Sequence, residues 1–207
     1  THLARTIKSA FSDANNAKKA PVVIDLPKNV LDQTTEFNYD GEINLEGYNP
    51  TYKGNPKQIT RAVELLCGAK RPAIISGGGV LSSNASEELT ELAKLTCIPV
   101  TTTLMGIGTY SEEDEKALGM LGMHGNYWAN YAICECDVLL AVGTRFNDRV
   151  TGPLSRFAID AHVIHIDIDP CSISKNIQAN IPIVGDAKLI LRDMLNEFKS
   201  RKHEINE

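Results

Sequence analysis

The sequence predicts an α/β fold in which helices cover both faces of a parallel β-sheet. Short apolar runs, each about the length of one strand, alternate along most of the chain with segments whose apolar residues recur at helical spacing. Continuous apolar runs are typical of strands that are buried on both faces, and right-handed βαβ crossovers place helices on each side of such a sheet. The composition, 43% apolar and 23% charged, is that of an ordinary folded domain and disfavours disorder.

Residues 1–30 predict one helix followed by one strand. Apolar residues such as Leu3, Ile7 and Phe11 lie at helical spacing, and the run 21–26 predicts a buried strand. Because one helix and one strand cannot bury a core, we interpret 1–30 as the C-terminal remnant of another domain or as an arm packed on the next domain. The chain begins with Thr1 and not with Met, so we expect a piece of a longer protein.

Residues 31–55 are rich in Asn, Gly and Pro and predict a linker, and residues 56–200 predict a central domain followed by a tail at 201–207. Asn55 before Pro56 is a helix start, since Asn is a good N-cap and the missing N–H of proline costs nothing at the first helical position. The predicted strands are 72–76, 98–102, 137–143, 163–167 and 181–184. The predicted helices start at Pro56 and near Asn84, and cover about 126–134, 172–176 and 187–199, the last capped by Asp186.

Charge and cysteine content narrow the class of partner. A net charge of −5 disfavours general affinity for nucleic acid or anionic lipid, and no apolar run is long enough to cross a membrane. The five cysteines lack the paired spacing of zinc or redox motifs, so we interpret them as reduced structural thiols, which weakly favours an intracellular compartment.

Ligands of such folds bind beyond the carboxyl ends of the strands, so the segments that follow the strands are the candidate sites. After the first strand, Gly77, Gly78 and Gly79 would let a ligand approach the backbone, and the next helix would offer free amides to a phosphate. A tight strand-to-helix turn is the alternative. The spacing is not Gly-x-Gly-x-x-Gly and no acid follows about twenty residues later, which disfavours an NAD dehydrogenase but not another nucleotide-like ligand.

The next two segments are apolar and rich in glycine. Residues 103–108 place hydroxyl, apolar and glycine residues at this edge, and residues 118–125 are dense in methionine and glycine. Methionine offers a flexible apolar wall to a flat ring. His124 is either a hydrogen-bond donor or a satisfied core histidine, and the second reading is preferred if the residue is considered alone.

Polar groups follow the later strands. Arg145 and Arg149 follow the third predicted strand of this domain, and a guanidinium suits phosphates and carboxylates because it donates two parallel hydrogen bonds. Asp167 ends the fourth strand, where it would accept from a ribose hydroxyl or cap the next helix, although capping is expected more of Asp169.

Motifs for covalent, metal or phosphoryl-transfer chemistry are absent from the sequence. It has no Gly-x-Ser-x-Gly elbow, P-loop, His-Glu-x-x-His or plausible metal cluster, and no group stands out as a general base or nucleophile. We therefore expect a binding domain with no catalytic residue and no metal ligand in this segment.

Six strings together resemble the acetolactate synthase (acetohydroxyacid synthase) large-subunit family. They are ISGGGV (75–80), VTTTLMGIG (100–108), LGMLGMHG (118–125), VGTRFNDRVTG (142–152), HIDIDP (165–170) and VGDA (184–187). The resemblance covers essentially the whole chain and is more specific than any single glycine motif. It implies a three-layer Rossmann-like (DHS-like) parallel sheet of about six strands, and it implies that 1–30 is the end of a pyrimidine-binding N-terminal domain.

The resemblance also implies a function for the parent protein. That family condenses two pyruvates, or pyruvate and 2-ketobutyrate, to acetolactate or acetohydroxybutyrate plus CO2 in branched-chain amino acid biosynthesis. Thiamine diphosphate and Mg2+ would bind outside this segment, whereas FAD, which takes no net redox part, would bind within it, and the segment alone would be inactive. The implied partners are copies of the same subunit in a homodimer or homotetramer and a small regulatory subunit. The implied location is the cytoplasm of a bacterium or archaeon, or an organelle in a eukaryote.

The residues that the resemblance assigns to FAD binding are Gly77, Gly78, Gly79, Thr103, Leu104, Met105, Leu121, Gly122, Met123, His124, Gly143, Thr144, Arg145, Asn147, Arg149, Val150, Asp167, Ile168, Asp186, Ala187 and Lys18. The residues that it assigns to the substrate channel are Lys28, Met123, Asp148 and Arg149. Two positions depart from the family pattern. Asn147 replaces an aspartate, and Lys18 replaces an arginine, which removes the bidentate fork.

Two alternatives to this function remain open. One is the central domain of another thiamine diphosphate-dependent carboligase, decarboxylase or oxidase, although the strings 118–125 and 145–152 favour the synthase. The other is a non-catalytic nucleotide-binding module that takes ADP in place of FAD.

Overall fold

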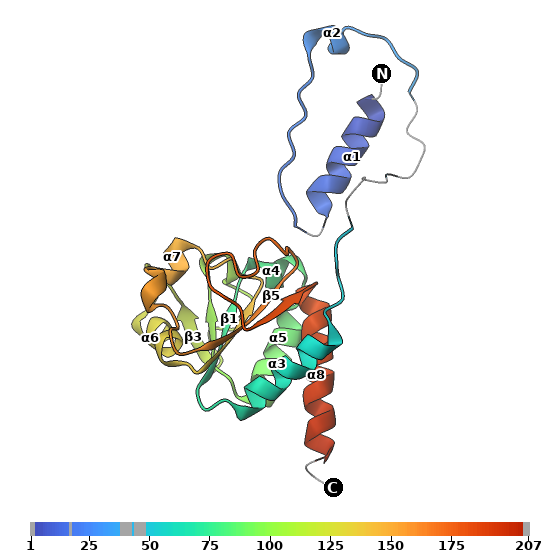
Figure 1. Cartoon of the computed structure of the whole chain (residues 1–207). Coiled ribbons are helices and arrows are strands. Elements are labelled where there is room, and N and C mark those ends of the chain that lie inside the picture. Colours follow the sequence, from blue (N-terminus) through green and yellow to red (C-terminus); the bar gives the residue numbers. More distant parts are fainter. Residues whose placement is uncertain (1–2, 17, 38–42, 44–48, 205–207) are drawn as a thin grey trace. The chain divides into compact units, whose positions relative to one another are not determined.

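A computed structural model of the chain (Figure 1) describes residues 3–16, 18–37, 43 and 49–204. The chain divides into two compact units, Thr1–Pro50 and Thr51–Glu207. The predicted linker and tail fall partly outside the described residues, and the predicted four-part division stays a prediction.

The first unit contains two helices, α1 (Leu3–Asn15) and α2 (Lys28–Leu31). The predicted strand over 21–26 is wrong, because these residues are neither helix nor strand. Val23 in the middle of this run is 91% exposed. A strand needs a neighbouring strand to satisfy its N–H and C=O groups, and none pairs with this run among the described residues of the unit.

The second unit is built on one six-stranded parallel sheet. The strands are β1 (Pro72–Ser76), β2 (Val100–Thr102), β3 (Ala117–Met120), β4 (Val138–Val142), β5 (His162–Asp167) and β6 (Ile181–Val184). The predicted α/β class is confirmed. Strand β3 was not predicted, because it is short, half-buried along its length and contains Gly119, and so lacks the apolar run that marked the other strands.

The strand order β3-β2-β1-β4-β5-β6 contains a topological switch point. From β1 the chain moves outward through β2 to β3, and it then returns to the other side of β1 to form β4. The connections that leave β1 and β4 therefore run in opposite directions, and doubly wound α/β folds bind their ligands at the carboxyl ends of the strands at such a point. This order is that of the dinucleotide-binding α/β folds.

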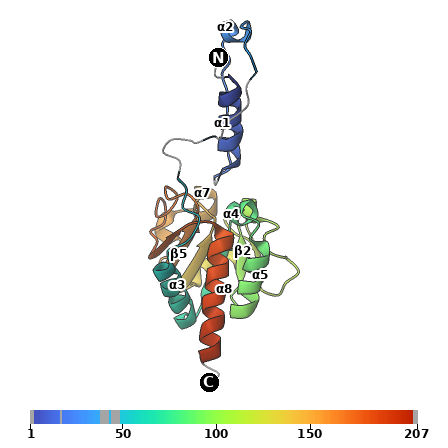
Figure 2. The same ribbon diagram turned by 90° about the vertical axis from the view of Figure 1, so that its right-hand side faces the viewer.

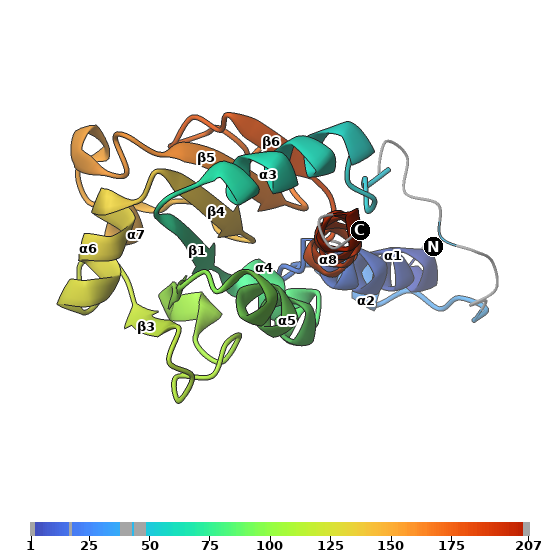
Figure 3. The ribbon, with the colours of Figure 1, turned by 90° about the horizontal axis from the view of Figure 1, so that it is seen from below.

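Helices cover both faces of the sheet. One face packs against α3 (Pro56–Gly68), α5 (Ser86–Thr96) and α8 (Ala187–Glu204), with the short α4 (Gly78–Ser82) above them, and Figure 2 shows α8 lying between α3 and α5. The other face packs against α6 (Tyr127–Glu135) and the short α7 (Asp148–Thr151). Figure 3 shows α6 on one side of β1 and β4 and shows α5 and α8 on the other. Two apolar cores result, one on each face of the sheet.

Three of these helices have a side-chain N-cap at the residue where the sequence predicts that the helix starts. Asn55 accepts from the N–H of Lys57 at 3.0 Å, and Asp186 accepts from the N–H of Leu189 at 3.2 Å. Asn126 accepts at the start of α6, from a backbone N–H at 2.8 Å. This helix was predicted at about 126–134 and is observed at Tyr127–Glu135, so the prediction is confirmed to within one residue.

The helix expected to be capped near Asn84 is confirmed, since it begins at Ser86 and its N-cap is Ala85. Two other helix predictions need correction. Residues 172–176 form turns and not a helix, and Ser174 there has φ +56°. The last helix continues to Glu204, beyond the predicted end at 199. Two short 3₁₀ helices, η1 (Leu104–Gly106) and η2 (Leu154–Arg156), were not predicted. No helix in the described ranges is long and apolar enough to span a membrane.

The turns that follow β1 and β4 contact each other through glycine. A Cβ on Gly143 would lie 2.5 Å from the Cα of Gly79, and a Cβ on Gly77 would lie 2.2 Å from the carbonyl oxygen of Gly143. Gly143 also has φ +59°, a conformation that residues with a Cβ rarely adopt. Glycine at these positions is therefore required by the approach of the two strand ends.

We expect Gly143→Ala to lower the free energy of unfolding by at least about 2 kcal/mol, because it adds both a backbone strain and a clash with the turn after β1. Urea denaturation of the purified chain measures this change. Gly68→Ala is the matched control, since a Cβ at Gly68 would meet nothing within 4 Å. Equal stability of the two variants would contradict the packing role given to Gly143.

Candidate functional site

The carboxyl edge of the sheet gathers the predicted site residues of the second unit. Parallel pairing places Ser76 beside Thr102 and Val142, and it places Val142 beside Ile166. The segments that follow these strands consequently lie along one edge. The predicted residues there are 77–79 after β1, 103–105 after β2, 121–124 after β3, 143–145, 147, 149 and 150 after β4, Asp167 and Ile168 at the end of β5, and Asp186 and Ala187 after β6.

The glycine run after β1 is mainly a packing element. The N–H of Gly79 donates to the carbonyl oxygen of Gly143 at 3.0 Å, and the N–H of Gly77 donates to that of Val142 at 2.9 Å. The prediction that the amides here are free for a phosphate is therefore wrong for Gly79. The alternative, a tight strand-to-helix turn, describes Gly77 and Gly79 correctly. Gly78 differs, because the nearest atoms to its Cβ position belong to Met105, at 3.1 Å.

An apolar strip lies exposed along the β2 and β3 side of this edge. Met105 is 70% exposed and Met123 is 61% exposed, and Leu104 and Ile107 are exposed beside Met105 in sequence. Thr103, in contrast, is buried, and its N–H donates to the carbonyl oxygen of Ser76 at 2.9 Å. Exposed methionine and leucine side chains clustered by rigid strand ends are typical of a surface that binds an apolar or flat group.

The methionine segment (118–125) and the arginine segment (144–152), which are separate in the sequence, meet at this edge. The N–H of Met123 donates to the carbonyl oxygen of Arg149 at 2.8 Å, and a Cβ on Gly122 would lie 2.3 Å from that same oxygen. The N–H of Gly122 donates to Oδ1 of Asn130 at 2.9 Å, and Nδ2 of Asn130 donates to the carbonyl oxygen of Gly122 at 3.0 Å. The loop after β3 is thus held against α6 and against the segment after β4.

The segment after β4 presents charged side chains to solvent. Arg145, Asn147, Asp148 and Arg149 are exposed. Asp148 pairs with Arg149 at 3.4 Å, with the two side chains 77% and 68% exposed, so this surface ion pair contributes little to stability. The two guanidinium groups are available to an anionic ligand at the strand edge.

The acids at the β5 and β6 ends have structural bonds. Asp167 is buried and accepts from the N–H of Asp169 at 2.9 Å. Asp169 accepts from the N–H of Cys171 at 2.9 Å. This is the capping bond expected of Asp169, but the segment that it caps is a turn and not a helix. Asp186 caps α8, and its own N–H donates to the carbonyl oxygen of Tyr52 at 2.8 Å. These bonds fix the directions of the carboxylates at this end of the edge.

The two histidines of this region have opposite environments. His124 is exposed, so its interpretation as a satisfied core histidine is wrong. His165, which sequence reasoning did not select, is fully buried, and its Nε2 lies 2.8 Å from the carbonyl oxygen of Thr144. Burial lowers the pKa of His165, and the bond to Thr144 offsets this only in part. A single polar residue in the apolar run 163–166 was the signal that could have identified it.

Lys18 and Lys28 belong to the first unit, so the described site is formed by the second unit alone. Lys28 is the first residue of α2. Their roles at the cofactor and in the substrate channel stay predictions.

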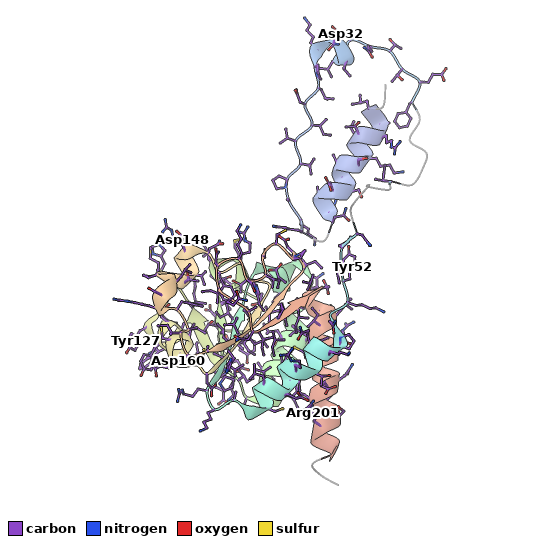
Figure 4. All side chains as sticks on the ribbon, viewed as in Figure 1. Asp32, Tyr52, Tyr127, Asp148, Asp160 and Arg201 are labelled. Atoms are coloured by element: carbon purple, nitrogen blue, oxygen red, sulfur yellow. The ribbon has the colours of Figure 1, made fainter. Side chains whose placement is uncertain are left out.

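A separate cavity lies at the opposite, amino edge of the sheet. Its volume is about 740 Å³, and it is lined mainly by apolar residues such as Leu66, Ile98 and Phe198, with Arg71 and Arg201 among its charged residues. None of the predicted site residues lines it. Figure 4 labels Asp148 at the carboxyl edge and Arg201 near the end of α8, which mark the two edges. Within the described ranges, no group of three or more His, Cys, Asp or Glu side chains could hold a metal ion.

The strand order and the all-parallel pairing define a doubly wound, three-layer α/β domain. Residues 59–194 match the family described as "Thiamine pyrophosphate enzyme, central domain". The match covers most of the chain, which therefore belongs to this family.

Relatives with high identity carry the name of a single enzyme. The chain is 52% identical to the probable acetolactate synthase large subunit of Methanocaldococcus jannaschii, over 92% of the chain and 33% of the relative. It is 46% identical to the acetolactate synthase large subunit of Buchnera aphidicola subsp. Schizaphis graminum, over 97% of the chain and 36% of the relative. It is 43% identical to the acetolactate synthase isozyme 3 large subunit of Escherichia coli K12, over 92% of the chain and 34% of the relative. The chain thus spans about a third of the length of these relatives.

The buried His165 makes stability depend on pH. Its pKa in the folded chain lies below the ordinary value of 6.5, so the unfolded chain binds the proton more readily. As pH falls below 6.5 we expect the free energy of unfolding to decrease by up to about 1.4 kcal/mol per pH unit, until the folded pKa is reached. Urea denaturation at pH 7.0 and 5.5, for the chain and for His165→Phe, measures this. The variant is expected to lose less stability over this interval, and an equal loss would contradict a buried neutral imidazole.

Proposed function

We propose that the chain is the central domain of an acetolactate synthase large subunit and that it binds FAD along the carboxyl edge of its sheet. The observation that carries the proposal is the convergence of six strand ends at one edge, around a topological switch point. Exposed apolar and cationic side chains lie along that edge. The names of the relatives support the identity of the parent enzyme.

The side chains at this edge have the chemistry that the ring, the pyrophosphate and the ribose of FAD require. The exposed Met105 and Met123 suit the flat ring, and the guanidinium of Arg145 suits the pyrophosphate. We propose that the ribose of the adenosine end donates to the carboxylate of Asp167, which ends β5. When bound, FAD supplies a flat ring to the substrate channel, and we infer from the family resemblance that it takes no net redox part.

The remaining predicted contacts follow the same order along the edge. We propose that the glycines 77–79 lie beside the nucleotide, that Thr103 and Leu104 line the flavin path, and that 121–124 lie along the ribityl chain and ring. Lys18 in the first unit would contribute a charge without the bidentate fork of an arginine. This substitution is expected to weaken its share of FAD binding.

We propose further that the intact protein condenses two pyruvates, or pyruvate and 2-ketobutyrate, to acetolactate or acetohydroxybutyrate and CO2 in branched-chain amino acid biosynthesis. Thiamine diphosphate and Mg2+ would be held by residues outside this chain. Within the chain, Arg149 would bind the carboxylate of the second keto acid, and Met123 would form an apolar wall of the channel. Lys28 and Asp148 are the other proposed channel residues.

The proposed partners are further copies of the large subunit, in a dimer or tetramer, and a small regulatory subunit. The proposed location is the cytoplasm of a bacterial or archaeal cell, or an organelle if the source is a eukaryote.

We expect Arg145→Ala to weaken FAD binding by about 10- to 100-fold, because a charge-assisted hydrogen bond to phosphate contributes about 1.5–3 kcal/mol. Flavin fluorescence titration of the chain measures the dissociation constant. Arg156→Ala is the matched control, since Arg156 is also exposed but lies in η2, outside the proposed site. Equal weakening by both variants would contradict a specific role for Arg145, and no binding by the unchanged chain would contradict FAD binding by this segment.

We expect the chain alone to produce no acetolactate from pyruvate, thiamine diphosphate and Mg2+, because it offers no assigned group for proton transfer or covalent catalysis at its edge. Colorimetric detection of acetolactate measures this. Turnover by the pure chain would contradict the proposed division of roles. Mass spectrometry of the ligand released from the purified chain separates the alternatives, since ADP in place of FAD would favour a non-catalytic nucleotide-binding module.

A further inference from the structure

The segment that carries Arg145 has an unusual backbone. Gly143 has φ +59° and Phe146 has φ +51°. A phenylalanine in the left-handed region is strained, because its Cβ crowds the neighbouring carbonyl, and such a conformation persists only where surrounding contacts hold it. Arg145 therefore directly precedes a residue whose conformation the rest of the domain must impose.

Three sets of contacts hold this segment. The N–H of Gly143 donates to the carbonyl oxygen of Ile166 at 2.8 Å, which extends the pairing of β4 with β5. Asn176 donates from Nδ2 to the carbonyl oxygen of Phe146 at 2.9 Å. From inside the domain, His165 on β5 bonds to the carbonyl oxygen of Thr144 at 2.8 Å.

The ring of Phe146 is the apolar anchor of the segment. It is 1% exposed, and it meets His165 edge to face with the ring centroids 5.0 Å apart. It also meets the ring of Phe157 edge to face, with the ring centroids 5.8 Å apart. His165 thus contacts the segment twice, through a hydrogen bond at Thr144 and through its ring at Phe146.

The direction of the hydrogen bond fixes the protonation of the imidazole. A carbonyl oxygen only accepts, so Nε2 of His165 carries the hydrogen and donates it. The other ring nitrogen, Nδ1, is buried and has no hydrogen-bond partner among the described residues. An apolar side chain on β5 would avoid the cost of that unpaired nitrogen, so what the histidine adds to the domain is its bond to Thr144.

The hydrogen bond from His165 to Thr144 constrains the backbone at Arg145. The carbonyl of Thr144 and the N–H of Arg145 belong to one planar peptide group, so a fixed carbonyl direction also fixes the plane from which the arginine starts. We propose that His165 is a positioning residue that sets the direction in which Arg145 presents its guanidinium to the pyrophosphate of a bound dinucleotide. This inference rests on the proposed FAD site, and His165 itself touches no ligand.

Three variants of the full 207-residue chain test the proposal, with FAD as the probe. His165→Leu keeps an apolar side chain of similar size and removes the donor, and we expect it to weaken FAD binding by about tenfold through misplacement of Arg145. His165→Gln retains an amide donor at the same reach, and we expect binding within about threefold of the unchanged chain. Val163→Ala is the matched control, because Val163 is buried on the same strand and in the same core but makes no bond to Thr144.

Fluorescence titration gives the FAD dissociation constants, and thermal unfolding gives the loss of stability of each variant. Backbone NMR of the chain without FAD supplies a second readout, since loss of the hydrogen bond should shift the carbonyl signal of Thr144 and the amide signal of Arg145 in His165→Leu and leave them in place in Val163→Ala. Weaker binding by His165→Leu, restored by His165→Gln and absent from Val163→Ala, supports the proposal.

The contrary outcomes are distinct. FAD binding that is the same in His165→Leu as in the unchanged chain overturns this inference alone. Equal weakening by His165→Leu and Val163→Ala also overturns it, because the effect would then follow general stability. Absence of FAD binding by the unchanged chain overturns the proposed function, and this inference falls with it.

Discussion

The contact between two glycine turns organises the edge of this domain. Gly79 after β1 and Gly143 after β4 meet backbone to backbone, and Gly79 donates to the carbonyl oxygen of Gly143 at 3.0 Å. Any Cβ at either position would separate the two strand ends. Because β1 and β4 flank the switch point, this contact sets how close the two strand ends lie there, and the segment that carries Arg145 begins at it.

The sequence was sufficient to predict most of the second unit, and the errors have physical causes. Continuous apolar runs marked β1, β4 and β5 within one or two residues. The short strand β3 escaped because it is half-buried and contains a glycine, and the run 21–26 was wrongly given a strand because apolar content alone does not supply a pairing partner. Hydrogen bonding between residues distant in sequence decides such cases.

The candidate site was predictable as a set of segments but not as an arrangement. The position of most segments after a predicted strand placed them at the carboxyl edge, which the fold confirms, whereas 121–124 follow β3, a strand that was not predicted. Sequence could not show that Gly77 and Gly79 serve packing, that Met123 is bonded to the backbone of Arg149, or that the buried histidine is His165 and not His124. These properties depend on which turns meet across the switch point.

Hydrogen–deuterium exchange of the chain with and without FAD tests the central claim most directly. We predict that FAD slows exchange in the segments 77–80, 103–108, 121–125 and 143–150 at the carboxyl edge. We predict no change in the segments 66–73 and 95–99, which border the cavity of about 740 Å³ at the amino edge. Protection confined to that cavity, or saturating FAD that leaves the carboxyl edge unprotected, would contradict the assignment of the site.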